Sequence, residues 1–70
     1  MPDPYLVEIG KRIRLRRVAI SMTQTELGEI SCLHRTYVSG VEGGKRNPTI
    51  LVLKRLAVGL QMTMQSLLKE

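Results

Sequence analysis

Two short helical patterns lie next to each other between Thr23 and Gly44, with almost no chain between them. Thr23 and Glu26 have the spacing of a capping box, in which the threonine hydroxyl accepts from the amide three residues on and the glutamate reaches back. A helix should therefore begin at this point. Leu27 and Ile30 have the spacing of its buried side.

The second of these helices follows the very short connection Ser31-Cys32. We expect it to run from about His34 to Glu42. Gly43-Gly44 should end it, because glycine adopts the left-handed conformation that closes a helix without a side-chain penalty. Two helices joined in this way predict a helix-turn-helix.

Three further helices are expected from the apolar spacing and the caps. They run from about Pro4 to Ile20, from Ile50 to Leu60, and from a Thr63 cap to Leu68. The inward residues are expected to be Leu6, Ile9 and Ile13 in the first helix and Ile50, Leu53, Leu56, Ala57 and Leu60 in the fourth. With 70 residues, the sequence predicts one domain, residues 1–70, of the all-α class with five helices.

The first helix carries an irregularity in its apolar stripe. Arg16 stands where an apolar residue is expected, and we expect Leu15 to take over part of that packing. The same helix carries most of the basic residues of the chain. A cationic amphipathic module that lies on a membrane is therefore a second functional hypothesis.

The formal net charge of +5 favours nucleic acid or an anionic membrane as the partner. Cys32 is the only cysteine and His34 the only histidine, so no internal disulfide, zinc site or other metal site is expected. No nucleophile, base and orienting group converge in the sequence, and we expect neither an enzyme nor a cofactor. No secretory signal or apolar run of roughly 18 residues is present, which predicts a cytoplasmic protein.

The outer face of the third helix is unusually bare. When Val38 and Val41 point inward, this face carries short, uncharged residues, namely Thr36, Ser39, Gly40 and Gly43. Glycine inside a helix costs about 1 kcal/mol relative to alanine. The close approach of a large object, such as the wall of the DNA major groove, would explain why the helix accepts Gly40.

Four residues on or beside this face are candidates for reading base edges. Arg35 suits O6 and N7 of guanine, and Thr36 suits a thymine methyl or a base acceptor. Ser39 is less discriminating. Tyr37 either contacts DNA or covers the edge of the core.

A second group of residues is expected to bind the phosphate backbone. Thr23 and Gln24 begin the second helix, whose free amides and positive end favour an anion. Beyond the third helix, the loop residues Lys45, Arg46 and Asn47 could hold the backbone on the other side. Arg17 is the one residue of the basic run in the first helix that we add to this group.

The stretch TQTELGEISCLHRTYVSGVEGGKRNPT resembles the helix-turn-helix core of the lambda-repressor-like (Xre-type) DNA-binding family. Within that family, RTYVSG and the short chain are similar to the controller proteins of restriction-modification systems. The resemblance implies a five-helix domain that dimerises through its C-terminal helices on a pseudo-palindromic operator. It also implies an ion pair between Arg17 and Glu42 near the DNA.

Controller proteins activate and then repress their own promoter, which delays the nuclease relative to the methyltransferase. The resemblance therefore implies a transcriptional regulator, with RNA polymerase as a candidate further partner. An antitoxin or phage-type repressor of the same fold is the nearest alternative.

The last two helices carry more apolar residues than a small core needs. The excess would form a patch too large for a monomer, which predicts the interface of a symmetric homodimer. The predicted interface residues are Leu51, Val52, Val58, Met62, Met64 and Leu67.

Overall fold

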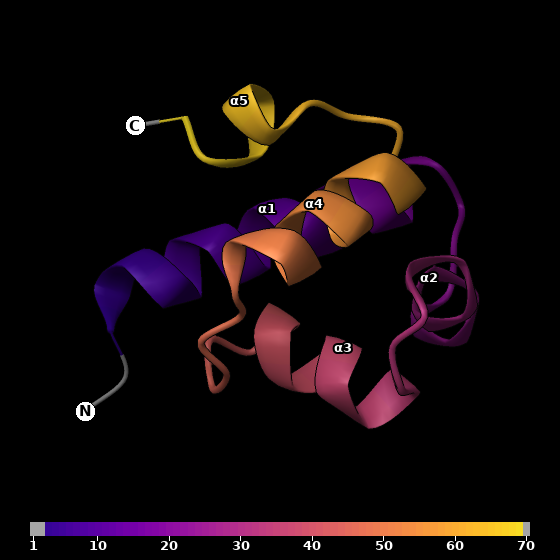
Figure 1. Ribbon diagram of the computed structural model, residues 1–70, viewed down its shortest axis with the longest axis horizontal. Coiled ribbons are helices and arrows are strands. Elements are labelled where there is room, and N and C mark those ends of the chain that lie inside the picture. Colours follow the sequence, from indigo (N-terminus) through magenta and orange to yellow (C-terminus); the bar gives the residue numbers. More distant parts are fainter. Residues whose placement is uncertain (1–2, 70) are drawn as a thin grey trace.

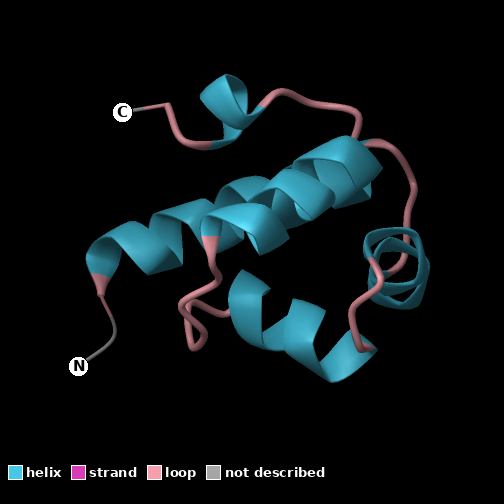
Figure 2. Ribbon diagram, viewed as in Figure 1, coloured by secondary structure: helices cyan, strands magenta, loops and turns pink. Residues whose placement is uncertain are grey.

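The computed structural model describes residues 3–69, which form five α-helices and, in that range, no strand (Figures 1 and 2). The helices are α1 (Pro4–Ala19), α2 (Gln24–Ser31), α3 (Arg35–Glu42), α4 (Ile50–Gly59) and α5 (Met64–Leu67). The predicted all-α class, the number of helices and the helix-turn-helix formed by the second and third helices are confirmed.

The helices enclose one aliphatic core. α3 packs against α1 and α2, α4 packs against α2 and α5, and α5 closes onto α1. In Figure 1, α3 and α5 lie on opposite sides of α1. The buried apolar residues come from all five helices and the turn after α4: Ile9, Ile13, Leu27, Val38, Val41, Leu53, Leu56, Ala57, Leu60 and Leu67.

Side-chain caps start the helices where the sequence indicated. At α2, the Thr23 hydroxyl accepts from the Glu26 amide at 3.0 Å, and the Glu26 carboxylate accepts from the Thr23 amide at 2.8 Å. Thr49 and Thr63 cap α4 and α5 through their hydroxyls. Each cap satisfies an amide that has no partner inside its own helix.

Two residues that we expected in the core are exposed. Ile30 keeps 55% of its surface, because Ser31, one turn after Leu27, takes the buried position of α2 instead. Ile50 keeps 75% of its surface, since it is the first residue of α4 and the buried side of that helix begins at Leu53. The predicted helical period is confirmed, but the buried faces of α2 and α4 are narrower than predicted.

Arg16 interrupts the apolar stripe of α1 for a reason that sequence alone did not indicate. Its Nε donates to the Leu60 carbonyl at 2.8 Å and its Nη2 to the Gln61 carbonyl at 3.2 Å. A guanidinium is favourable there because the Leu60 and Gln61 carbonyls lie in the turn that follows α4, beyond its helical hydrogen bonds. The expectation that Leu15 replaces this packing is wrong, because Leu15 is exposed.

The close crossing of α1 and α3 depends on Gly10. A Cβ atom at this position would lie 2.4 Å from the Val41 carbonyl oxygen and 2.5 Å from that of Glu42. Because Gly10 has no side chain, the backbones of α1 and α3 can touch. This contact places the second half of α1 beside the C-terminal end of α3.

Ile9 and Ile13 are enclosed by this packing. These apolar residues of α1 are therefore inside the domain and are not free to lie on a membrane, which argues against the membrane-surface hypothesis. In residues 3–69, no helix is long and apolar enough to cross a bilayer.

Candidate nucleic-acid interface

One side of α3 is buried and the other faces solvent. Val38 and Val41 contact the core, whereas Arg35, Thr36 and Ser39 are exposed. The predicted division of this helix into inner and outer faces is confirmed. The predicted base contacts of the three exposed residues stay a prediction.

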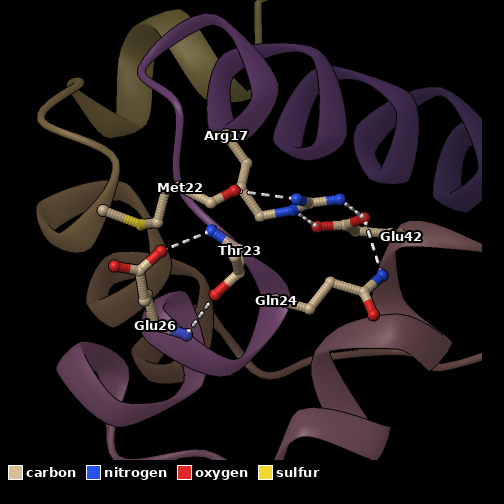
Figure 3. A network of polar contacts seen from close by, with 6 residues as sticks. All are labelled: Arg17, Met22, Thr23, Gln24, Glu26 and Glu42. Carbon is tan, nitrogen blue, oxygen red and sulfur yellow. Dashed lines mark hydrogen bonds and ion pairs between the residues drawn. The ribbon is translucent and has the colours of Figure 1, made fainter.

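The outer face is held in place by a polar network that joins three helices (Figure 3). Arg17 of α1 donates from Nε to Glu42 Oε2 at 2.6 Å and from Nη2 to Oε1 at 2.9 Å. Gln24 of α2 donates from Nε2 to the same Oε1 at 3.1 Å. The ion pair implied by the family resemblance is therefore present, and it fixes the end of α3 relative to the start of α2.

The guanidinium of Arg17 is occupied by protein atoms. Besides the Glu42 carboxylate, it donates from Nη1 to the Met22 carbonyl at 2.8 Å. The hydrogen bond to Glu42 raises the pKa of Arg17, burial lowers it, and the charge of Glu42 raises it again, with a net increase. Arg17 thus stays charged and is directed towards Glu42 and Met22. Only the N–H groups that these two residues leave free could make the predicted contact with a phosphate.

The start of α2 presents donors to solvent. Within residues 3–69, no bonding partner is found for the backbone amides of Gln24 and Thr25, the first two of the helix. The Gln24 side-chain amide uses one N–H on Glu42 and keeps a second. The Thr23 hydroxyl oxygen is the acceptor in the cap, and its proton can be donated either to the Glu26 carboxylate or to a phosphate. These N–H and O–H groups can donate hydrogen bonds to a phosphate at the positive end of the helix dipole.

Arg46 lies over the side of α3 that we expected to be bare. A Cβ atom at Gly40 would lie 2.8 Å from Arg46 Cγ, and the Arg46 guanidinium carbon lies 5.8 Å from the centre of the Tyr37 ring. The expectation that Gly40 leaves space for a groove wall is therefore wrong. The space is filled by the arginine stem, and the guanidinium is positioned by a cation–π contact.

Tyr37 covers the edge of the core, which is one of the two roles that its position suggested; the other role, DNA contact, stays a prediction. Its ring is half-buried and packs against the core, and it also supports Arg46. Lys45 and Asn47 are exposed on either side of Arg46, while Pro48 is buried and anchors the loop. The three predicted loop residues are thus placed together beside the end of α3.

Arg14 is a residue of this face that sequence reasoning missed. It lines a hollow together with Arg17, Gln24, Ser39, Glu42 and Gly43. Its side chain is exposed, and no hydrogen bond or ion pair to it is found among the described residues. The available signal was its position one helical turn before Arg17.

The predicted dimer interface is only partly at the surface. Leu51 and Val58 of α4 are 59% and 67% exposed, and they line an apolar hollow that also includes Ile30 of α2. Val52, Met62 and Met64 are half-buried against the core. Leu67, the last residue of α5, is fully buried, so its assignment to an interface is wrong.

No cluster of three or more histidine, cysteine, aspartate or glutamate side chains that could hold a metal ion occurs between residues 3 and 69. The polar groups described above are amides, hydroxyls and guanidinium groups. Such groups suit an anionic, hydrogen-bonding partner.

Comparison with known proteins agrees with this geometry. The helix-turn-helix family model matches residues 13–67. Control protein C.SmaI of Serratia marcescens is 38% identical over 60 residues, which are 86% of this chain and 71% of that protein.

Two solved structures extend the similarity to the whole fold. The restriction-modification controller protein C.AhdI of Aeromonas hydrophila has 39% identity and a TM-score of 0.87, over 89% of this chain and 94% of that one. The controller protein C.Esp1396I, solved as a tetramer with its natural 35-base-pair operator, has 34% identity and a TM-score of 0.86, over 93% of this chain and 86% of that one. The resemblance stated from the residues is confirmed, and the chain belongs to the helix-turn-helix family, among the restriction-modification controller proteins.

Proposed function

We propose that this protein is a sequence-specific DNA-binding regulator of transcription, which binds a pseudo-palindromic operator as a dimer and controls a restriction-modification system. The observation that carries this proposal is the rigid outer face of α3. Arg35, Thr36 and Ser39 are exposed there, and the Arg17–Glu42–Gln24 network fixes this face relative to the start of α2. The proposed activity is binding, with no chemical step.

Base recognition is assigned to the first half of α3. Arg35 is exposed and can form two hydrogen bonds to O6 and N7 of a guanine. Thr36 and Ser39 lie on the same face and are short enough to let the helix enter the major groove. Tyr37 lies at the edge of this surface and supports Arg46, so its contact with DNA would come from the exposed part of its ring.

Phosphate contacts are assigned to both ends of this face. Thr23, Gln24 and the first amides of α2 would bind the backbone on one side, with Arg14 beside them. The loop that follows α3 would bind it on the other side, through Lys45, Arg46 and Asn47. Such contacts orient the protein, while the base contacts select the sequence.

Dimerisation would place two copies of α3 in successive major grooves. The domain measures 29 × 24 × 22 Å, which is less than the roughly 34 Å between half-sites on one side of the duplex. Leu51, Val58 and Ile30 form the surface that we assign to the two-fold contact. The tetramer of C.Esp1396I on its operator supports assembly of controller proteins on DNA.

A regulator bound next to a promoter acts on RNA polymerase, either by blocking its site or by contacting it. We therefore propose RNA polymerase as a further partner and the cytoplasm as the compartment, because that is where the proposed operator and polymerase would be found.

Selection of random duplexes with the purified protein at moderate salt tests the proposal. We expect a palindromic consensus whose half-sites are about 10 base pairs apart. The variant Arg35→Ala, Ser39→Ala serves as the control, since it removes two exposed side chains from α3 and should enrich no consensus while unfolding at the same midpoint. Enrichment of no sequence by the unmodified protein would reject the proposal.

A further inference from the structure

The recognition helix is capped by a histidine that also contacts one of the proposed base-reading residues. His34 Nδ1 accepts from the Thr36 amide at 3.1 Å, and the same nitrogen lies 2.7 Å from the Thr36 hydroxyl oxygen. Both residues are exposed at the start of α3. Elsewhere in residues 3–69, neither side chain has another hydrogen-bonding partner.

The contact with the Thr36 amide assigns the tautomer of the His34 ring. A nitrogen that accepts from the Thr36 N–H must present its lone pair, so in this arrangement Nδ1 carries no hydrogen and the ring hydrogen is on Nε2. The 2.7 Å contact then requires the Thr36 hydroxyl to be the donor, because Nδ1 has no hydrogen to give. Nδ1 is thus shared by an amide and a hydroxyl, both from Thr36.

This arrangement restricts what Thr36 can offer to DNA. Once its only hydroxyl hydrogen is directed at His34, the oxygen presents lone pairs to solvent and can only accept. In the major groove, adenine N6 and cytosine N4 are donors, whereas guanine O6, guanine N7 and thymine O4 are acceptors. An accepting hydroxyl forms a hydrogen bond with the first two bases and is repelled by the acceptors of the others.

We propose that His34 is a specificity-determining residue: through Nδ1 it holds the Thr36 hydroxyl as an acceptor, so that Thr36 selects a base with an exocyclic amino group. His34 needs no contact with the base, and it acts by positioning. The inference rests on the proposed function, because it assumes that α3 enters the major groove. It replaces the role expected of Thr36 from the sequence, a contact with a thymine methyl or with an acceptor on a base, by a contact with a donor on the base.

The test compares base preferences obtained by random-duplex selection for the wild type and four variants. His34→Gly removes the ring, and glycine is itself a tolerated helix-capping residue, so α3 should persist. His34→Asn replaces Nδ1 with a carbonyl oxygen that can accept from both Thr36 groups. Thr36→Val removes the hydroxyl and keeps the shape, and His34→Gly is also made in that background.

At the base pair that Thr36 reads, we expect the wild type and His34→Asn to prefer adenine or cytosine. His34→Gly should reduce this preference by about fivefold, the worth of one neutral hydrogen bond, because its hydroxyl can also donate. In the Thr36→Val background, His34→Gly should leave the base preference unchanged. A role in capping alone would instead lower the affinity for all sequences equally.

Three results would overturn the proposal. They are an unchanged base preference in His34→Gly, a wild-type preference for guanine or thymine at this position, and an equal effect of His34→Gly with and without the Thr36 hydroxyl. If His34→Gly does not fold, the nitrogen chemical shifts of the His34 ring in the wild type decide the question: Nδ1 without a hydrogen is expected, and a hydrogen on Nδ1, which would leave the Thr36 hydroxyl free to donate, would overturn the proposal. If the wild type selects no sequence at all, the proposed function fails and this inference fails with it; a palindromic consensus with an unchanged His34→Gly profile rejects this inference alone.

Discussion

The Nε of Arg17 lies 2.6 Å from Oε2 of Glu42, and this contact joins the first helix to the last residue of α3. The side chains of the pair are only 12% and 4% exposed. The geometry is bidentate, and Gln24 adds a further donor to the carboxylate. A buried pair of this kind gives modest net stability but is costly to break, because the remaining charge is left unpaired.

Substitution of Glu42 by Gln should therefore destabilise the domain strongly. Loss of the carboxylate leaves the Arg17 charge without a counter-ion in a largely buried site, which typically costs about 3–5 kcal/mol of unfolding free energy. Urea denaturation followed by circular dichroism measures the change. Glu8→Gln is the control. The Glu8 side chain is 54% exposed and its Oε2 lies 3.6 Å from Arg12 Nε. Exposed ion pairs of this kind contribute less than about 1 kcal/mol. Similar small losses in both variants would contradict the structural role of Glu42.

The capping box predicts a specific acid limb in the stability profile. Hydrogen bonds from the Thr23 backbone amide and from the Thr23 side chain lower the pKa of Glu26. Because the folded pKa lies below the unfolded one, this stabilisation is complete above the unfolded pKa and is lost as the pH falls through the folded pKa.

Glu26→Gln should therefore reduce the loss of unfolding free energy on acidification, since glutamine keeps the cap and cannot titrate. Urea midpoints measured from neutral to acidic pH test this. Glu29→Gln makes the same charge change in the same helix outside the capping box. An acid limb that is equally steep in Glu26→Gln and in the wild type would show that the cap makes no difference.

Arg35 and Arg46 should affect DNA binding in different ways. Arg35→Ala should relax the preference for one base pair, worth about 1–3 kcal/mol of discrimination, with little change in salt dependence. Arg46→Ala should weaken binding to all sequences and reduce the slope of log affinity against log salt concentration by about 0.9. Dissociation constants for the consensus and a scrambled duplex at several salt concentrations separate the two. Equal losses with unchanged salt slopes would remove both assignments.

The contact between Arg46 and Gly40 can be tested by adding a methyl group. Alanine favours a helix over glycine by about 1 kcal/mol, so Gly40→Ala should stabilise the Arg46→Ala variant by about that amount. In the wild type the gain should be smaller, because the new Cβ would lie 2.8 Å from Arg46 Cγ and the arginine must move. DNA affinity should fall as Arg46 is displaced. Identical stabilisation in the two backgrounds, measured by denaturation, would mean that Arg46 does not occupy this space.

The exposed apolar side of α4 should control assembly. Val58→Glu and Leu51→Glu each place a charge on the surface assigned to the two-fold contact, and burying an unpaired charge is unfavourable. Both variants should sediment as monomers at concentrations where the wild type is a dimer. Leu15→Glu, a similar change at an exposed leucine of α1, should remain dimeric. Dimers in all three would place the interface elsewhere.

Local features were the most predictable from the sequence. The Thr23–Glu26 capping box, the Thr49 and Thr63 caps and the inward positions of Val38 and Val41 are all present in the structure. Each depends on residues three or four apart, which are neighbours on any helix. The Arg17–Glu42 pair is a long-range contact, and it was expected only because the chain resembles a known family.

The sequence by itself determined the number of helices, their starting points and the helix-turn-helix, because these follow from short-range capping and periodicity. Only the tertiary structure decided that Arg46 fills the space over Gly40, that Ile30 is exposed while Leu67 is buried, and that Arg16 binds the end of α4. In each of these cases, burial or contact is set by a helix or loop distant in the chain. An α-helical period gives the direction of a side chain but not the element that covers it, and that information exists only once the helices are packed.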